Sequence, residues 1–418
     1  GTYFQQWSSD TMWQALNSAG LRAHPFEAVW FLHKQPPFFD ALRALLIGLL
    51  RGVPDEQLGV RLDGLLYVVW ALVVGASAVL VCRWLQQSTS RLFASIMAIV
   101  WSLLPASVYY ATFLEPTVVV SFGVLWVCLE LRRLSSGGGS IPRLTSASLL
   151  LFFTRATFQW PFLASLLVCL LLMRLPRRRV WAFVAACVLV AGPYTWKQWH
   201  VFHMTGTTFV PRHSYYLVAG SEMPTEAFEA KARAVPWTYP PEAALSEGKF
   251  NTEEDWRKSF AFSELAVAHV REHPVTSLKN VLITFMVFNW NEYWRPSAEF
   301  TPNVAVQALP WSEPFHRIFA YPVNLGLLLL ALWQWRRRRR EAGLAVIDGR
   351  TVGVALPIAY IFLTSTLVNG DGHGWTEAVR YKFFLEAVFF VFSAEQLYGM
   401  AERYLAGLRP PTVGEGGL

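Results

Sequence analysis

Charged side chains are scarce in this sequence. Only 16% of its 418 residues are Asp, Glu, Lys or Arg, whereas roughly a quarter is usual in soluble proteins. The hydrophobic share is 54%, and the run at 62–85 is long enough to cross a bilayer, which takes about 20 apolar residues. The deficit argues against a soluble protein. We expect an all-α polytopic membrane protein.

Cysteine is also rare, and common enzyme signatures are missing. The four cysteines show no spacing typical of a disulfide framework or a metal site. There is no P-loop, G-x-S-x-G or Rossmann fingerprint, and no H-E-x-x-H pair. We expect no cofactor, although histidines outside the membrane leave a divalent metal open. These histidines are His24, His33, His203, His213 and His373.

The net charge of +7 raises the question of a nucleic-acid partner. The basic residues, however, cluster at the ends of apolar runs, as at Arg177–Arg179 and Arg336–Arg340. Such clusters are typical of cytoplasmic loops of membrane proteins. No nucleic-acid motif accompanies them, so we expect no nucleic-acid partner.

The apolar runs predict about nine spans, and a further span is expected upstream of Gly1. If the spans alternate, the arginine clusters share one side, which is cytoplasmic by the positive-inside rule. The expected spans are 62–85, 92–110, 115–131, 144–158, 160–174, 180–197, 315–335, 352–369 and 382–400.

The polar stretches then share the extracytoplasmic side of a single membrane domain, 1–418. Residues 1–61 form the first outer loop and include an amphipathic helix from Phe38. Residues 198–314 form a cap, with a helix at 253–273 and an interfacial or re-entrant helix at 277–291. The loop from Asp371 faces the same side.

Several charged residues on this side have two alternative interpretations, one structural and one functional. Asp10 is either the N-cap of a helix near Thr11 or a carboxylate with a raised pKa. Glu115 is either a helix-start residue or a second functional carboxylate. Arg155 is unusual within or at the edge of a span, where a functional role and a pairing with Glu115 both explain it. Arg380 and Lys382 either snorkel or bind an anion.

The segment HKQPPFFDALRALLIGLLRGVPDEQLGVRLDG resembles the first loop of GT-C glycosyltransferases, especially the protein O-mannosyltransferase and aminoarabinose transferase group. It carries the Pro36-Pro37 pair, a turn at Gly52–Glu56 and Arg61-Leu62. Further similar features follow the family's order. They are Asp10 upstream, Glu115 in LPASVYYATFLEPTVVV, His273-Pro274, and RYKFFLE from Arg380.

The resemblance implies a GT-C-like helical bundle and an inverting glycosyltransferase. Such an enzyme moves a monosaccharide from a polyprenyl-phosphate donor to a hydroxyl of a protein, lipid or glycan acceptor. The location it implies is the bacterial cytoplasmic membrane, with the active site extracytoplasmic.

The resemblance also implies roles for named residues. Asp10 would be the catalytic base, and Glu115 the second catalytic carboxylate. The expected lipid-phosphate ligands are Arg380, Lys34, Arg155 and Lys382, and the other substrate-binding residues are His33, Gln35 and Glu377. The alternative is a transporter or flippase for a lipid or glycan intermediate, which predicts midplane charges and repeated halves. Apart from Arg155 we expect no such charges, and no internal repeat is visible.

Overall fold

In a computed structural model of the chain, every regular element of the described part is a helix. An isolated bridge between Leu16 and Gly248 is the only strand-like pairing there. The described residues are 9, 16–112, 114–220, 226–246, 248, 251–290, 333, 336, 340, 349–367 and 374–408.

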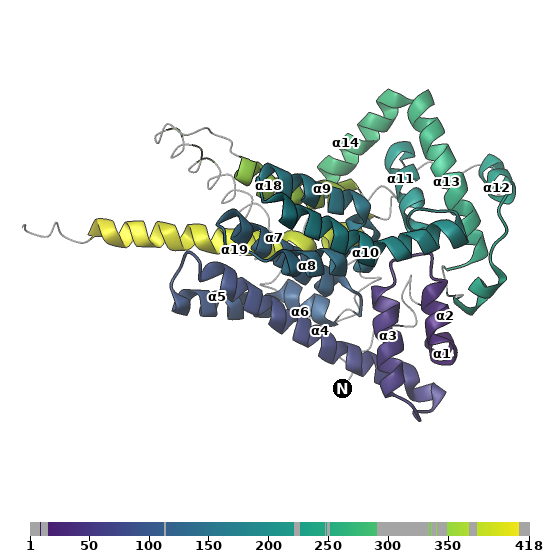
Figure 1. Cartoon of the computed structure of the whole chain (residues 1–418), viewed down its shortest axis with the longest axis horizontal. Coiled ribbons are helices and arrows are strands. Elements are labelled where there is room, and N and C mark those ends of the chain that lie inside the picture. Colours follow the sequence, from purple (N-terminus) through teal and green to yellow (C-terminus); the bar gives the residue numbers. More distant parts are fainter. Residues whose placement is uncertain are drawn as a thin grey trace, which may run out of the picture.

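Apolar helices that run roughly along the long axis of the molecule form a bundle (Figure 1). Their buried side chains make one core, which includes the large residues Trp70, Trp84 and Trp101. The helices of the bundle are α4 (Asp55–Leu85), α5 (Arg91–Leu103), α6 (Pro105–Thr112), α7 (Thr117–Ser135), α8 (Ile141–Thr154), α9 (Trp160–Leu172), α10 (Arg177–Phe202), α18 (Gly349–Leu367) and α19 (Gly374–Leu408).

Three described segments are long and apolar enough to cross a membrane: Asp55–Leu85, Arg177–Phe202 and Phe383–Leu405. The pair α5 and α6 forms a fourth if the bent pair is one span. This composition is compatible with an integral membrane protein.

Shorter helices gather at one end of the bundle, at the right of Figure 1, which we call the cap end. The opposite end carries the arginines in the last turns of α4 and α7 and at the starts of α5 and α10, and we call it the basic end. The helices of the cap end are α1 (Ser18–Ala23), α2 (Pro25–Trp30), α3 (Phe38–Leu49), α11 (Phe209–Ala219), α12 (Glu226–Arg233), α13 (Glu253–Glu272), α14 (Pro274–Trp290) and the 3₁₀ helix η2 (Pro241–Ser246).

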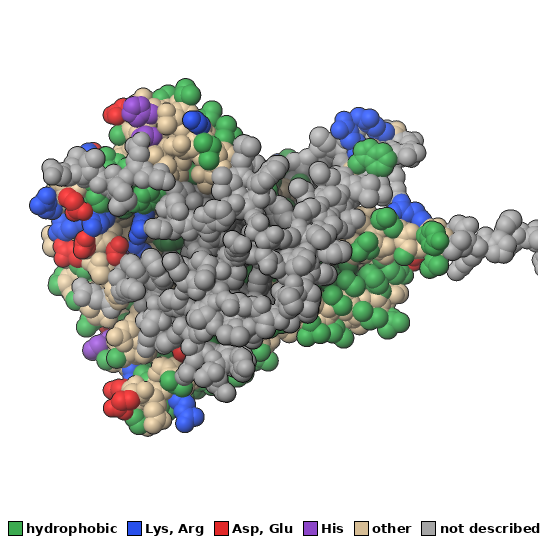
Figure 2. Space-filling view, turned by 180° about the vertical axis from the view of Figure 1, so that it is seen from behind, with side chains coloured by type: hydrophobic (Ala, Val, Ile, Leu, Met, Phe, Trp, Pro, Cys, Tyr) green, Lys and Arg blue, Asp and Glu red, His purple; other side chains and the backbone are tan. Residues whose placement is uncertain are grey.

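The surface differs along the bundle. In Figure 2, acidic, basic and histidine side chains gather over the cap end, at the left, whereas hydrophobic side chains cover the region of α5 at the lower right. Exposed Leu92, Ile99 and Leu103 on α5 contribute to this apolar surface. It is the distribution expected of helices whose sides face lipid.

The sequence predicted several helices well. The amphipathic helix from Phe38 is α3, and the helices expected at 253–273 and 277–291 are α13 and α14. Of the span expected at 315–335, only residue 333 is among the described residues.

Three expected boundaries are wrong. The span predicted at 92–110 breaks at Leu104 into two helices inclined by 58°, because Pro105 disfavours a helical conformation in the residue before it. The span predicted at 144–158 ends at Thr154, where Arg155 is extended. The last helix begins at Gly374 rather than near Lys382, so residues expected in a loop are helical.

Candidate functional site

A buried ion pair lies at the cap end. The Arg155 guanidinium donates to the Glu115 carboxylate, with Nη2 and Oε1 2.7 Å apart, and each residue is only 5% exposed. Glu115 precedes Pro116, the N-cap of α7, and Arg155 caps the end of α8 in an extended conformation. The pairing that the sequence left open for Arg155 is therefore present.

Helix α19 packs beside this pair through Phe384. The Arg155 guanidinium carbon lies 5.9 Å from the centre of the Phe384 ring, and the rings of Tyr110 and Phe383 are 4.4 Å apart. Arg380 lies one turn before Phe384 on the same helix. The side chains of Arg380, Lys382 and Glu377 lie outside the described residues.

The chain beside the Pro36-Pro37 pair is fixed by the cap. The Asn251 side-chain oxygen accepts from the backbone N–H groups of His33, at 3.0 Å, and Lys34, at 2.9 Å. The His33 carbonyl accepts from the Thr208 N–H at 3.0 Å. Buried Lys34 pairs with Asp255 of α13, with Nζ and Oδ1 3.3 Å apart. Segment 33–34 thus connects the first loop with the cap.

Burial controls the protonation of this segment. It lowers the pKa of His33 to about 3, and the charges of Lys34 and Lys197 act in the same direction. The fully buried ring packs against Phe202 and Tyr239, and its Nε2 lies 3.1 Å from the Tyr239 hydroxyl. Burial also lowers the pKa of Lys34, while Asp255 opposes that shift.

Gln35 belongs to a second buried network. Its amide nitrogen donates to Asp40 at 3.0 Å, and Asp40 pairs with Arg43 at 2.9 Å. Asp40 also accepts from the Leu16 N–H at 3.1 Å, and Arg43 donates to the Leu16 carbonyl. This network anchors the end of the opening loop to α3.

Asp10 lies outside the described residues. The preceding residue is described: the Ser9 N–H donates to the Asp63 carboxylate of α4 at 3.0 Å. Asp63 therefore holds the opening loop against α4.

Sequence reasoning missed several buried charges, and Lys197 and Glu386 are two of them. Lys197 near the end of α10 is 2% exposed, and its ammonium group donates to the Leu32 carbonyl at 3.3 Å. Glu386 of α19 is 3% exposed. From the sequence we expected Arg155 to be the only charged residue within the membrane spans. The signal was available in both cases, since each is an isolated ionisable residue in an apolar run.

Among the described histidines, His269 and His273 at the end of α13 lie together, with ring centres 5.1 Å apart, whereas the histidines singled out in the sequence lie apart. His203 stacks on Trp237 and His213 on Phe209, while His24 caps α1. His373 lies outside the described residues. Across the described ranges, no three His, Cys, Asp or Glu residues are grouped as metal ligands.

Comparison with family models, with curated proteins and with solved structures found no match to this chain.

Proposed function

We propose that this protein is an inverting membrane glycosyltransferase. It transfers a monosaccharide from a polyprenyl-phosphate donor to an acceptor hydroxyl on the extracytoplasmic face of a bacterial cytoplasmic membrane. The proposed architecture is a GT-C-like bundle with about nine spans and the cap end outside. The cap end would then face the donor at the membrane surface.

The observation that carries the proposal is the buried Glu115–Arg155 pair at the cap end, beside Phe384 of α19. Buried charges near a membrane are costly, and they are most often retained for function. Lys34 lies in the same cap. A carboxylate and cations at one end of a bundle are what transfer from a lipid phosphate requires.

The proposed reaction is a direct displacement. The acceptor oxygen attacks the anomeric carbon while the bond from that carbon to the phosphate oxygen breaks. Asp10 takes the acceptor proton, and Glu115 orients the acceptor. The phosphate leaves with the bonding electron pair, and Arg380 with Lys34 neutralises its charge. Attack opposite the leaving group inverts the configuration.

Asp10→Asn tests the base. The Asn side chain keeps the size but cannot accept the proton, so the turnover rate should fall at least about 100-fold. Purified protein in liposomes would be supplied with polyprenyl-phosphate sugars and candidate acceptors. Asp55→Asn is the matched control, because Asp55 is 76% exposed and pairs with Arg22 at the start of α4.

A transporter or flippase gives a different result in the same liposomes. It would move a labelled polyprenyl-phosphate sugar between leaflets without forming a glycosidic bond. Movement without transfer, or equal transfer by wild type and Asp10→Asn, contradicts the proposed function.

A further inference from the structure

The corner between α13 and α14 carries two histidines. His269 lies in the last turn of α13, and His273 is the C-cap residue, whose N–H donates to the His269 carbonyl at 2.8 Å. The two helices project from the bundle, and the corner lies at the tip of that projection (Figure 1). Histidine side chains are visible on the projection in Figure 2, at the upper left. The pair is therefore open to solvent.

The spacing of the pair is that of a known type of metal ligand. Residues four positions apart on a helix are neighbours on its surface. In the H-E-x-x-H helices of metalloproteases, two histidines at this spacing bind Zn²⁺ and the Glu acts as the general base. Here Val270 follows the first histidine in place of that Glu. The corner thus has the ligand pair of such a helix without its catalytic base, which favours binding of an ion over hydrolysis.

The distance between the two rings fits a shared ion. Their centres lie 5.1 Å apart, and their planes are inclined by 55°. With Zn–N bonds of about 2.0 Å and tetrahedral geometry, two imidazoles on one ion have their centres about 5 Å apart. The observed spacing is therefore that of two ligands of one ion, and side-chain rotation is enough to turn a nitrogen of each ring toward it.

His269 also has a nitrogen without a partner. Its Nε2 is buried and makes no hydrogen bond within the described part of the chain, although the residue as a whole is half-buried. Buried polar groups are nearly always hydrogen-bonded in native proteins. An ion held between the two rings would give this nitrogen a partner.

The end of α13 favours a positive ligand. The C-terminus of a helix has unpaired carbonyl groups and the negative end of the helix dipole. The charged neighbours Arg271 and Glu272 are both exposed and have opposite signs. The helix end therefore decides the local preference, and it attracts a cation.

We propose that His269 and His273 form a binding site for a divalent transition-metal ion such as Zn²⁺. The two imidazoles bind the ion, and water occupies its other positions, since no third His, Cys, Asp or Glu joins the pair among the described residues. The ion links the last turn of α13 to the residue that precedes α14, and so it fixes the corner. This site does not depend on the proposed sugar transfer.

Calorimetric titration of Zn²⁺ into protein without a histidine tag, in detergent at neutral pH, tests the site. Wild type should bind an ion that His269→Gln and His273→Gln each bind at least about tenfold more weakly. Even the loss of a residue that only supports a metal ligand costs about that much. Mg²⁺ should not compete, because it prefers oxygen ligands. Acidification to about pH 5 should abolish binding, since imidazole must be neutral to bind a metal.

Two exposed histidines outside the pair provide matched controls. His24→Gln and His200→Gln remove imidazoles before α2 and on α10, and both variants should bind Zn²⁺ like wild type. Saturating Zn²⁺ should raise the unfolding temperature of wild type but not that of the double variant His269→Gln/His273→Gln. With a chelator present, the double variant should unfold near the wild-type temperature, so that loss of binding is distinguished from loss of the fold.

Three results would overturn the inference. The first is that wild type shows no saturable Zn²⁺ binding tighter than about 1 mM. The second is wild-type affinity in the double variant. The third is weakening by only one of the two single substitutions, which would show that other residues hold the ion. The titration contains no sugar donor, so failure of the proposed function would leave its outcome unchanged.

Discussion

Arg155 and Glu115 pair within the buried part of the cap end, 2.7 Å apart and 40 residues apart in sequence. The pair joins the end of α8 to the start of α7. Desolvation opposes its formation, so each charge depends on the other for its stability. The local structure and any chemistry of Glu115 are therefore linked to Arg155.

Removal of one partner of this ion pair should lower the stability of the fold more than removal of both partners. Glu115→Gln leaves a buried guanidinium without its carboxylate and should destabilise the protein by about 3 kcal/mol. The double variant Glu115→Gln/Arg155→Met replaces the charges with neutral groups and should recover most of that loss, but not transfer activity. Unfolding in detergent, followed by tryptophan fluorescence, measures both effects. A double variant less stable than the single one would contradict this interpretation of the pair.

The ion pair at the basic end should affect stability alone. Arg132 of α7 lies 2.7 Å from Glu395 of α19, and the two side chains are 27% and 12% exposed. Glu395→Gln should cost about 1 kcal/mol, because the pair is partly solvated. Transfer activity should remain at the wild-type level, since the change lies at the end opposite the proposed site. A large loss of activity without a loss of stability would place function at the basic end.

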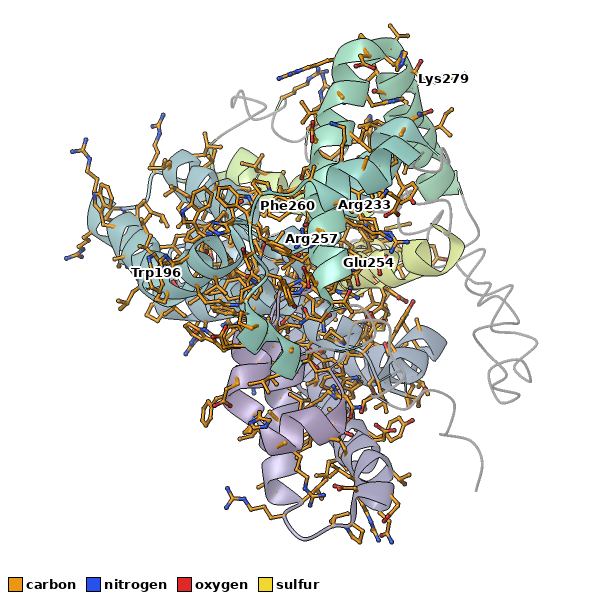
Figure 3. All side chains as sticks on the ribbon, turned by 90° about the vertical axis from the view of Figure 1, so that its right-hand side faces the viewer. Trp196, Arg233, Glu254, Arg257, Phe260 and Lys279 are labelled. Carbon is orange, nitrogen blue, oxygen red and sulfur yellow. The ribbon has the colours of Figure 1, made fainter. Side chains whose placement is uncertain are left out.

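The proposed orientation can be tested by labelling. Glu254 on α13, labelled in Figure 3, is 74% exposed at the cap end, and Gln87 after α4 is exposed at the basic end. In a Cys82→Ser background, Glu254→Cys should react with a membrane-impermeant maleimide in intact cells. Gln87→Cys should react only after the cells are opened, because the arginines nearby favour the cytoplasm. If Gln87→Cys reacts in intact cells and Glu254→Cys reacts only after the cells are opened, the cap end and the proposed site lie on the cytoplasmic face.

Apolar periodicity and length predicted most helices of the bundle, because burial and lipid contact impose them directly. The predicted helix ends were wrong where local sequence, and not the overall apolar pattern, decides where a helix begins or ends. Pro105 breaks the second predicted span, and the last helix continues upstream through polar residues that resemble a loop in sequence. This earlier start of α19 matters for the proposed site, because the expected substrate-binding residues Glu377 and Arg380 lie in the helix and not in the loop before it.

The site was predicted in part. The positive-inside rule placed Glu115, Arg155 and Lys34 on one side; in the structure Glu115 pairs with Arg155, and Lys34 pairs with Asp255 of the cap. No pattern in the sequence indicated that Asp255 and Thr208 contact segment 33–34, from which they are more than 170 residues away. Such partners depend on how the cap folds back over the first loop, and periodicity carries no information about that contact.

The last prediction concerns acid sensitivity. His33 has an ordinary pKa of 6.5 when unfolded and a pKa of about 3 in the fold, chiefly because it is buried. Between these values the unfolded chain binds a proton that the folded chain does not. The contribution that neutral, buried His33 makes to the stability of the fold is therefore fully present above pH 6.5 and is lost as the pH falls toward 3.

The loss should amount to about 2 kcal/mol between pH 6.5 and 5. His33→Gln removes the titrating group and should flatten the fall in unfolding temperature across this range. His200→Gln, at an exposed position on α10, is the matched control and should follow wild type. Parallel curves for wild type and His33→Gln would show that the buried imidazole is not the acid-sensitive group.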